Sequence, residues 1–445
     1  MLKLKLKALG ALGAILLLAL GVSGCVKSKA ADKTKIVFWN EMTGPGQVQL
    51  TKFANEFNAS QSKYKVVPEF EGSYNEVVQK INHTHGSNAS PALFQSFEIS
   101  TTQLANSKMT TPVQKFIDRD HYDMSKIMPV AKKFYSKNGV QVSMPFNTSQ
   151  PVLYYNQSML KRLGIKNPPK SPSYSDITKL ATEITQKSKG KIKGMTVEEY
   201  AWLLEEFMAN QKERLANNQN GREKTPTKIK LDTPAAKHAM EWVRENIKKK
   251  NFINFGSGSS AEANEIAAFL SGKLGVFIQS SAYIGQLTTG MKDKLGITEY
   301  PHADGTKSNG VAIGGASMWI SNDKPKNVQE GAWQFIKFLM KPENQAKWQQ
   351  QTGYLALNKD SQKTKILKDL YKKVPAAKVP GEQLAHTKPN SANSGILLEG
   401  LIQERVLTQT AMQQIYNGSN IDKSLKTAQD GMNEYIKNNN RANGY

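Results

Sequence analysis

The stretch Lys35-Ile-Val-Phe-Trp39 opens a regular alternation of strands and helices, and this alternation decides the fold class. Its short apolar run is typical of a buried strand, and Tyr64-Lys-Val-Val67 and Ala92-Leu-Phe94 repeat the pattern. Two amphipathic segments separate these strands. Their apolar residues at helical spacing are Leu50, Phe53, Ala54 and Phe57 in the first and, after the candidate cap Ser73, Val77, Val78 and Ile81 in the second. Residues 35–98 therefore predict the opening of a doubly wound α/β lobe.

The rim of this predicted sheet is the first candidate for a binding site. Open α/β sheets bind their ligands with the loops at the carboxyl ends of the strands. This rule places the loop 39–46, Tyr74 and Glu98 on one rim. Farther along the chain, the sequence predicts mainly helices over 157–270, strands over 274–280 and 311–320, and further helices from Asn327 onward.

The N-terminal 24 residues have the composition of a secretory signal. Three lysines precede the apolar stretch 8–22, which is too short to span a bilayer with ease. The sequence Val22-Ser-Gly-Cys25 resembles a bacterial lipobox, in which the cysteine receives a diacylglyceryl group and becomes the new N-terminus. We therefore expect cleavage before Cys25 and a lipid anchor on that residue. The alternative is an ordinary signal peptide with a chance cysteine.

The anchored protein is expected on the extracytoplasmic face of the cell membrane. Residues 1–24 form the signal peptide in this reading, and the small and charged residues of 25–33 form a short tether. Because Cys25 is the only cysteine, no disulfide can stabilise the fold, and stability depends on apolar packing.

The formal net charge of +23 raises the question of a nucleic-acid partner. The lysines are scattered along predicted amphipathic helices, and no basic run interleaved with aromatic residues is present. We therefore expect no binding of nucleic acid. Two explanations of the charge remain open, a solvated basic surface facing an anionic envelope and the steering of an anionic solute toward its site.

Motifs of known catalytic centres are missing from the sequence. It contains no G-x-S-x-G, no P-loop and no H-E-x-x-H, and the pair His83-Thr-His85 is more typical of a surface than of a metal site. Adjacent glutamates such as Glu198-Glu199 point in different directions on a helix and make poor acid–base partners. We therefore expect a protein that is not an enzyme and needs neither a metal nor a cofactor.

Three segments carry a family resemblance. They are Ser143-Met-Pro-Phe-Asn-Thr-Ser-Gln-Pro-Val-Leu-Tyr-Tyr-Asn156, Ile313-Gly-Gly-Ala-Ser-Met-Trp319 and Lys341-Pro-Glu-Asn-Gln-Ala-Lys-Trp-Gln-Gln-Gln-Thr-Gly-Tyr354. The chain resembles the extracellular solute-binding proteins of ABC importers, in particular receptors for glycerol-3-phosphate and glycerophosphodiesters. The resemblance implies a monomer that delivers a small phosphorylated glycerol ligand to permease subunits in the membrane.

The same resemblance implies the architecture. It predicts an α/β, two-lobe periplasmic-binding-protein fold, type II-like and similar to that of maltose-binding protein, with the ligand cleft between the lobes. One lobe is expected to comprise residues 34–147 plus 282–321, and the other residues 148–281 plus 322–445. Closure would then occur by rotation about the segments that cross between the lobes.

Carried over residue by residue, the resemblance also implies the ligand contacts, which are Tyr74, Glu98, Ser149, Ser280, Gly315, Tyr354 and Arg405. The set suits a phosphorylated polyol. Hydroxyls and a glycine N–H donate to phosphate oxygens, and an arginine fork neutralises the phosphate. A carboxylate accepts hydrogen bonds from glycerol hydroxyls. The alternative is structural, with ordinary packing of the tyrosines and an ion pair between Glu98 and Arg405.

One departure from the family pattern affects the choice of ligand. Where glycerol phosphate receptors have a pocket tryptophan just before a second one, this chain has Val197-Glu-Glu-Tyr-Ala-Trp202. Glu199, Tyr200 and Trp202 thereby become candidate head-group contacts, since a carboxylate and aromatic rings suit choline or ethanolamine and disfavour a phosphate monoester. We therefore expect glycerophosphodiesters such as glycerophosphocholine to bind better than glycerol-3-phosphate.

Two other functions remain as alternatives. An oligosaccharide receptor of an ABC importer would share this fold, with Trp39 and Trp202 as candidates for stacking on sugar rings, but Arg405 would then have no anion to meet. A surface hydrolase would need a nucleophile or metal constellation that the sequence does not offer.

Overall fold

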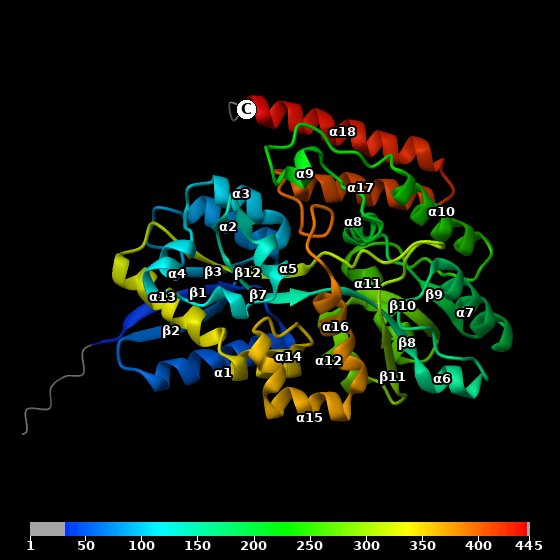
Figure 1. Ribbon diagram of the computed structural model, residues 1–445, viewed down its shortest axis with the longest axis horizontal. Helices are drawn as coiled ribbons and strands as arrows, with labels where there is room; N and C mark the ends of the chain where they lie inside the picture. Colours follow the sequence, from blue (N-terminus) through cyan, green and yellow to red (C-terminus); the bar gives the residue numbers. More distant parts are fainter. Residues whose placement is uncertain (1–31, 443–445) are drawn as a thin grey trace, which may run out of the picture.

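The computed structural model describes residues 32–442, and it is built around two separate mixed β-sheets. Figure 1 shows these sheets side by side, each with its own covering helices. The predicted signal peptide and Cys25 lie outside the described residues. No helix within 32–442 combines the length and the apolar character needed to cross a membrane.

The first sheet has the strand order β2-β1-β3-β12-β4, and β7 also pairs with β12. The strands β1, β2 and β3 are parallel, whereas β12 runs antiparallel to β3, β4 and β7. Their bounds are β1 Thr34–Asn40, β2 Tyr64–Phe70, β3 Leu93–Phe97, β4 Thr110–Thr111, β7 Met144–Ser149 and β12 Gly314–Ser321. The strands and helices predicted for residues 35–98 are thereby confirmed.

The first two helices of this lobe have the apolar face and the N-terminal cap that the sequence predicts. Helix α1 (Gly44–Ser60) buries all four apolar residues that were predicted to face the core. Helix α2 (Tyr74–Thr84) starts with a capping box, in which Ser73 accepts from the backbone of Glu76 and the Glu76 side chain accepts from the backbone of Ser73. The further elements of this lobe are η1 Glu98–Ser100, α3 Thr101–Asn106, α4 Gln114–Asp120, η2 Met124–Lys126, α5 Pro129–Phe134, β5 Ser136–Lys137 and β6 Val140–Gln141.

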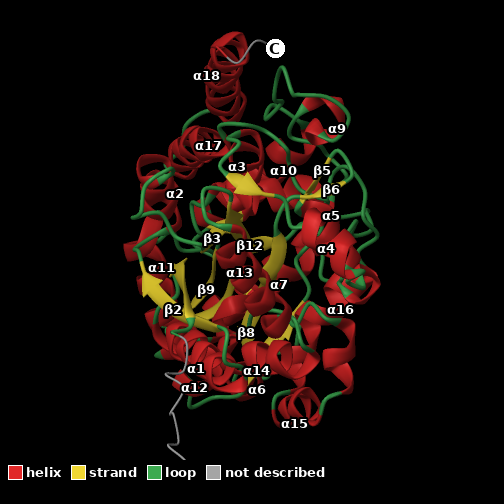
Figure 2. Ribbon diagram, turned by 90° about the vertical axis from the view of Figure 1, so that its left-hand side faces the viewer, coloured by secondary structure: helices red, strands yellow, loops and turns green. Residues whose placement is uncertain are grey.

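The second sheet has the order β11-β8-β10-β9, with β8 antiparallel to β10 and β11 and with β9 parallel to β10. Its strands are β8 Pro151–Asn156, β9 Lys193–Thr196, β10 Leu274–Ser280 and β11 Leu295–Thr298. The helices of this lobe are α6 Gln157–Arg162, α7 Tyr174–Lys187, α8 Ala201–Asn210, α9 Asn217–Gly221, α10 Pro234–Lys248, α11 Gly258–Leu270, α17 Leu401–Tyr416 and α18 Ile421–Ala442. In Figure 2, α18 lies at the top of the molecule, above α17.

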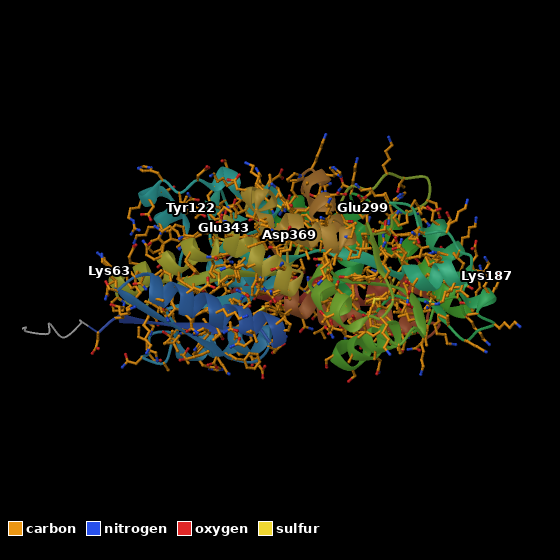
Figure 3. The ribbon with its side chains drawn as sticks, turned by 90° about the horizontal axis from the view of Figure 1, so that it is seen from below. Lys63, Tyr122, Lys187, Glu299, Glu343 and Asp369 are labelled. Atoms are coloured by element: carbon orange, nitrogen blue, oxygen red, sulfur yellow. The ribbon has the colours of Figure 1, made fainter. Side chains whose placement is uncertain are left out.

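Within residues 32–442 the chain passes between the lobes in three places. The first is Gln150, which joins β7 to β8 and is fully buried. The second is the segment 299–313 between β11 and β12. The third is the segment 358–400, which contains η4 Lys359–Lys363, α15 Lys365–Lys373, η5 Pro375–Lys378 and α16 Val379–His386. Figure 3 shows the elongated result, with Lys63 and Lys187 toward opposite ends and Asp369 between them.

The distribution of elements differs from the predicted division in two segments. Residues 282–321 do not stay in one lobe, because η3 (Ser281–Tyr283) and α12 (Ile284–Gly290) lead into β11, which pairs with β8 of the second sheet. Only β12 belongs to the first sheet. The apolar residues of a four-residue strand do not reveal which sheet it joins.

The second difference concerns the start of the predicted 322–445 segment. Helices α13 (Lys326–Leu339) and α14 (Pro342–Thr352) pack on the first lobe. Phe335 of α13 lies edge-on to Phe38 of β1, with ring centroids 5.9 Å apart. An amphipathic helix shows that it has an apolar face, but its sequence does not specify which sheet covers that face.

The side chain of Arg222 connects the two lobes through main-chain acceptors. Arg222, which follows α9 of the second lobe, donates from its guanidinium to the main-chain carbonyl oxygens of Lys133 at 2.9 Å and Ser136 at 3.0 Å in the first lobe. It also donates to the carbonyl oxygens of Ser394 and, at 3.2 Å, Gly395 in the third crossing segment. Burial lowers the pKa of Arg222 to about 10. We call this arrangement the Arg222 clasp.

Candidate functional site

A cavity of about 610 Å³ lies between the two sheets, and residues of both lobes line it. The carboxyl ends of β1 and β3 contribute the loop 41–46 and Glu98, as expected for the rim of an α/β sheet. Every ligand residue carried over from the resemblance lines this one cavity, as do two of the three candidate head-group contacts; they are Tyr74, Glu98, Ser149, Ser280, Gly315, Tyr354, Arg405, Tyr200 and Trp202. The cavity is thus the candidate ligand site.

The tyrosines on the first-lobe side are held in place by their neighbours. The Tyr74 ring stacks on Phe97 with centroids 5.2 Å apart, and its hydroxyl accepts from Asn147 Nδ2 at 2.9 Å. Tyr354 stacks on Trp348 with centroids 5.9 Å apart. Burial raises the pKa of both phenols, so both remain protonated and can donate to a ligand.

Two glycines bring the backbone of β12 close to the cavity. Gly315 has φ +101°, and a Cβ atom there would lie 1.9 Å from the carbonyl oxygen of Asn147. At Gly314 a Cβ atom would lie 2.9 Å from the Trp202 ring. A side chain at either position would displace a wall of the cavity, so both positions require glycine.

The predicted serines differ in their local bonding. Ser280 Oγ accepts from the backbone N–H of Ala282 at 3.2 Å and caps η3. Ser149 ends β7 opposite Gly314, and its hydroxyl makes no hydrogen bond to another described residue. Ser149 is therefore free to donate to a ligand, whereas Ser280 has a structural task as well.

Arg405 of α17 is held by two carboxylates. Its Nη2 lies 2.7 Å from Glu98 Oε1, and its Nε lies 2.7 Å from Glu205 Oε1. The three side chains are 11%, 6% and 12% exposed, so the ion pairs are largely desolvated. The expected bidentate fork for a phosphate is thus already occupied, because Glu98 and Glu205 take Nε and Nη2. The structural alternative considered for Glu98 and Arg405, an ion pair, is present.

The candidate head-group contacts separate into two groups. Tyr200 and Trp202 face the cavity, and the Arg405 guanidinium lies 5.9 Å from the centre of the Tyr200 ring. Trp202 Nε1 is buried, forms no hydrogen bond within residues 32–442 and can donate to a ligand. Glu199 does not line the cavity, which corrects its expected position. Its Oε1 accepts from Asn254 Nδ2 at 2.8 Å, and this bond turns the carboxylate away.

Two carboxylates that sequence reasoning missed do line the cavity. Glu41 follows β1, and Glu262 of α11 accepts a hydrogen bond from the Tyr283 hydroxyl. Glu41 lies within the loop 39–46, which the strand pattern placed on the rim. The sequence thus predicted that this loop lies at the site, but it did not single out Glu41. Glu262 had no comparable signal, since helices α11 and η3 bring it to Tyr283 only in three dimensions.

A second pair of carboxylates lies behind the second-lobe side of the cavity. Gln279 Nε2 donates to Glu198 Oε2 at 3.1 Å and to Glu265 Oε1 at 2.9 Å. Burial raises the pKa of Glu198 to about 7 and that of Glu265 to about 9. Near pH 7, Glu265 is therefore mainly neutral, and Glu198 is about half protonated.

Acidic residues outnumber basic ones in the described lining of the cavity. Among the described residues that line it, Glu41, Glu98 and Glu262 are acidic and Arg405 alone is basic. No group of three or more His, Cys, Asp or Glu side chains within residues 32–442 is arranged to hold a metal ion. The arrangement can therefore bind a small polar ligand through hydroxyl and indole donors, and it favours a ligand that carries a positive charge.

Two proteins named UgpB and one sugar-binding protein are similar to this chain in sequence or in structure. The sn-glycerol-3-phosphate-binding periplasmic protein UgpB of Escherichia coli O1:K1 / APEC is 28% identical over 430 residues, covering 94% of this chain and 96% of that protein. UgpB from Mycobacterium tuberculosis, solved in complex with glycerophosphocholine, superposes with a TM-score of 0.73 at 20% identity, covering 92% of this chain and 99% of that one. The sugar-binding protein MalE from Xanthomonas citri superposes with a TM-score of 0.76 at 16% identity, covering 92% and 98%.

The structural likeness confirms the predicted two-lobe, maltose-binding-protein-like α/β fold. The family profile described as "Bacterial extracellular solute-binding protein" matches residues 52–379, which is most of the chain. This chain belongs to the bacterial extracellular solute-binding proteins.

Proposed function

We propose that this protein is the receptor of an ABC importer that captures glycerophosphodiesters, such as glycerophosphocholine, and glycerol-3-phosphate. Its lobes close over the ligand and deliver it to the permease subunits. The observation that carries the proposal is the convergence of all seven carried-over ligand residues on one cavity between the lobes. The 28% identity to the glycerol-3-phosphate-binding UgpB over nearly the whole chain supports it.

The donors around the cavity fit a phosphodiester. Ser149, Trp202 and the two phenols supply neutral donors for phosphate oxygens, while Glu98 and Glu205 already neutralise Arg405. A monoester would bring a second negative charge into an acidic cavity. A diester with a cationic head group brings its own compensating charge and is therefore the preferred ligand in this proposal.

Cell-surface attachment through Cys25 is part of the same proposal. The variant Cys25→Ser is expected to lose the lipid and either enter the medium or remain unprocessed. Fractionation of cells followed by mass spectrometry of the N-terminus measures this. A processed Cys25→Ser protein that still partitions with membranes would contradict the lipid anchor while leaving the receptor assignment intact.

An oligosaccharide receptor is the second candidate, and the aromatic lining of the cavity favours it. The rings that line the cavity are Tyr74, Phe97, Tyr200, Trp202, Tyr283 and Tyr354. Such rings stack on sugar faces, and the sugar-binding MalE has the same fold. The acidic lining of the cavity favours a ligand with a cationic group instead.

Calorimetry separates the two candidates. We expect heat of binding with glycerophosphocholine and glycerophosphoethanolamine, weaker binding of glycerol-3-phosphate and none of maltose. Binding of maltose without binding of either diester would overturn the proposal. Tighter binding of glycerol-3-phosphate than of glycerophosphocholine would retain the receptor and contradict the preferred head group.

A further inference from the structure

Glu41 stands at the carboxyl end of β1, on a loop that buried hydrogen bonds hold in place. The preceding residue, Asn40, is fully buried. Its Oδ1 accepts from the backbone N–H of Met42 at 3.1 Å, and its Nδ2 donates to the carbonyl oxygen of Glu69 at 2.9 Å. The Asn40 side chain thus shapes the turn that carries Glu41 into the cavity lining.

The Glu41 carboxylate is buried, and no side chain or backbone group in the described part of the chain is hydrogen-bonded to it. The residue is 9% exposed, and neither Oε1 nor Oε2 forms a hydrogen bond within the described residues. The other two glutamates that line the cavity are satisfied, Glu98 by Arg405 and Glu262 by the Tyr283 hydroxyl. A buried carboxyl with both oxygens free is costly to maintain unless a ligand supplies the missing partner.

The surroundings of Glu41 favour a cation as that partner. Burial raises the pKa of Glu41 well above its ordinary value. The titratable groups that interact with it are the phenols of Tyr74 and Tyr354, both neutral because burial also raises their pKa. Glu98, the charged group beyond these phenols, is neutralised by Arg405. No positive side chain of the described residues is thus committed to Glu41.

We propose that Glu41, together with the rings of Tyr74 and Tyr354, receives the cationic ammonium head group of the ligand and thereby selects diesters with a cationic head group over diesters with an uncharged one. This inference rests on the proposed function, and it replaces Glu199 as the source of head-group selectivity. A carboxylate beside aromatic faces is a favourable site for quaternary and primary ammonium groups.

A ligand hydroxyl would be a poorer partner for Glu41. A hydroxyl can donate one hydrogen bond, but it leaves the carboxylate charge uncompensated in a desolvated cavity, so the carboxyl would remain protonated. An ammonium group compensates the charge and drives ionisation of Glu41. Binding of a diester with a cationic head group should therefore release a proton near neutral pH, and binding of a diester with an uncharged head group should not.

The test compares Glu41→Gln with wild type for two diesters that share the glycerophosphoryl part. Glycerophosphocholine carries the cation, and glycerophosphoglycerol carries an uncharged head group. We expect Glu41→Gln to weaken glycerophosphocholine roughly tenfold or more and to change glycerophosphoglycerol by less than about twofold, as removal of one member of a desolvated charge pair predicts. Glu71→Gln is the matched control, since it removes the same charge from the same lobe but Glu71 pairs with Lys80 outside the cavity.

A second measurement uses wild type alone, so the inference stays testable even if a variant is unstable. Titrations in two buffers of different ionisation enthalpy count the protons released on binding. We expect release with glycerophosphocholine and none with glycerophosphoglycerol. Equal weakening of both diesters in Glu41→Gln, no weakening of either, or equal proton release with both would overturn the role of Glu41. If folded wild type bound neither diester, the proposed function itself would fail.

Discussion

The two walls of the cavity differ in how fully their charged groups are paired within the protein. On the second-lobe wall, Arg405 is paired with carboxylates, Glu262 with Tyr283, and Gln279 serves two further glutamates. On the first-lobe wall, Glu98 is paired with Arg405, whereas neither carboxylate oxygen of Glu41 has a hydrogen-bond partner among the described residues. Apart from the free Trp202 Nε1 donor, the second-lobe wall is therefore satisfied before the ligand binds, whereas Glu41 on the first-lobe wall depends on the ligand for a partner. Substitutions in the second-lobe wall should affect stability and binding together, and those in the first-lobe wall should affect binding alone.

The largest expected effect is that of Arg405→Ala. Removal of the guanidinium leaves Glu98 and Glu205 buried side by side, and breaking such a desolvated pair costs about 3–5 kcal/mol of folding free energy. Ligand binding should weaken as well. Urea denaturation with and without ligand measures both. If Arg405→Ala weakened binding without lowering stability, Arg405 would behave as we expect of first-lobe residues. The predicted difference between the two walls would then be wrong.

The pH dependence of stability comes next. Because burial raises the pKa of Glu198 to about 7 and of Glu265 to about 9, the folded protein holds more protons than the unfolded chain above pH 4.5, the ordinary pKa of a glutamate. Stability is therefore greatest at the acidic end of this range and falls as the pH rises toward 9. Glu265→Gln removes one of these groups and should flatten the decline of Tm between pH 5 and 9. A wild-type Tm that rises with pH over this range would contradict the assignment.

Ser149 and Ser280 test the difference between the two walls through smaller expected effects on binding. Ser149→Ala and Ser280→Ala should each weaken diester binding by about 1–2 kcal/mol, the scale of a hydrogen bond to a charged group. Only Ser280→Ala should also lower the melting temperature, because its hydroxyl caps η3. Calorimetry and thermal melts of both variants decide this. Equal loss of stability in the two variants would mean that the walls do not differ as described.

The smallest expected effect is that of Arg222→Lys at the clasp. A lysine keeps the charge but offers one point donor where the guanidinium serves several carbonyl oxygens. We expect a modest loss of stability and a more open ensemble in the absence of ligand, seen as a larger radius of gyration by X-ray scattering. Saturating ligand should restore the compact form. If the radius of gyration of the ligand-free variant equalled that of wild type, the Arg222 clasp would have no role in lobe closure.

Much of the fold followed from local patterns. The strands and helices of residues 35–98 were predictable because each carries its own periodicity, and Ser73 and Thr233 cap the helices that follow them. The lobe membership of β11, α13 and α14 was not predictable, because it depends on pairing between segments distant in sequence. Local pattern specifies an apolar face but not the surface that covers it.

The candidate site shows the same limit at the level of side chains. Matched segments implied Tyr74, Ser149, Gly315 and Tyr354, which all line the cavity. The prediction for Glu199 was wrong because Glu199 accepts a hydrogen bond from Asn254, and the sequence pattern does not reveal this contact. The expected phosphate fork of Arg405 was occupied by Glu205, which sits on a different helix. Partners that meet only after folding are not visible in a linear motif.

The Arg222 clasp also has a consequence for mutational tolerance. Its acceptors are main-chain oxygens, which every amino acid possesses, so exchange of Lys133 or Ser136 leaves the acceptors in place. The donor side depends on one guanidinium at one position. A saturation library should therefore show larger losses of stability at position 222 than at its first-lobe partners, so that this contact between the lobes constrains the side chain on one side only.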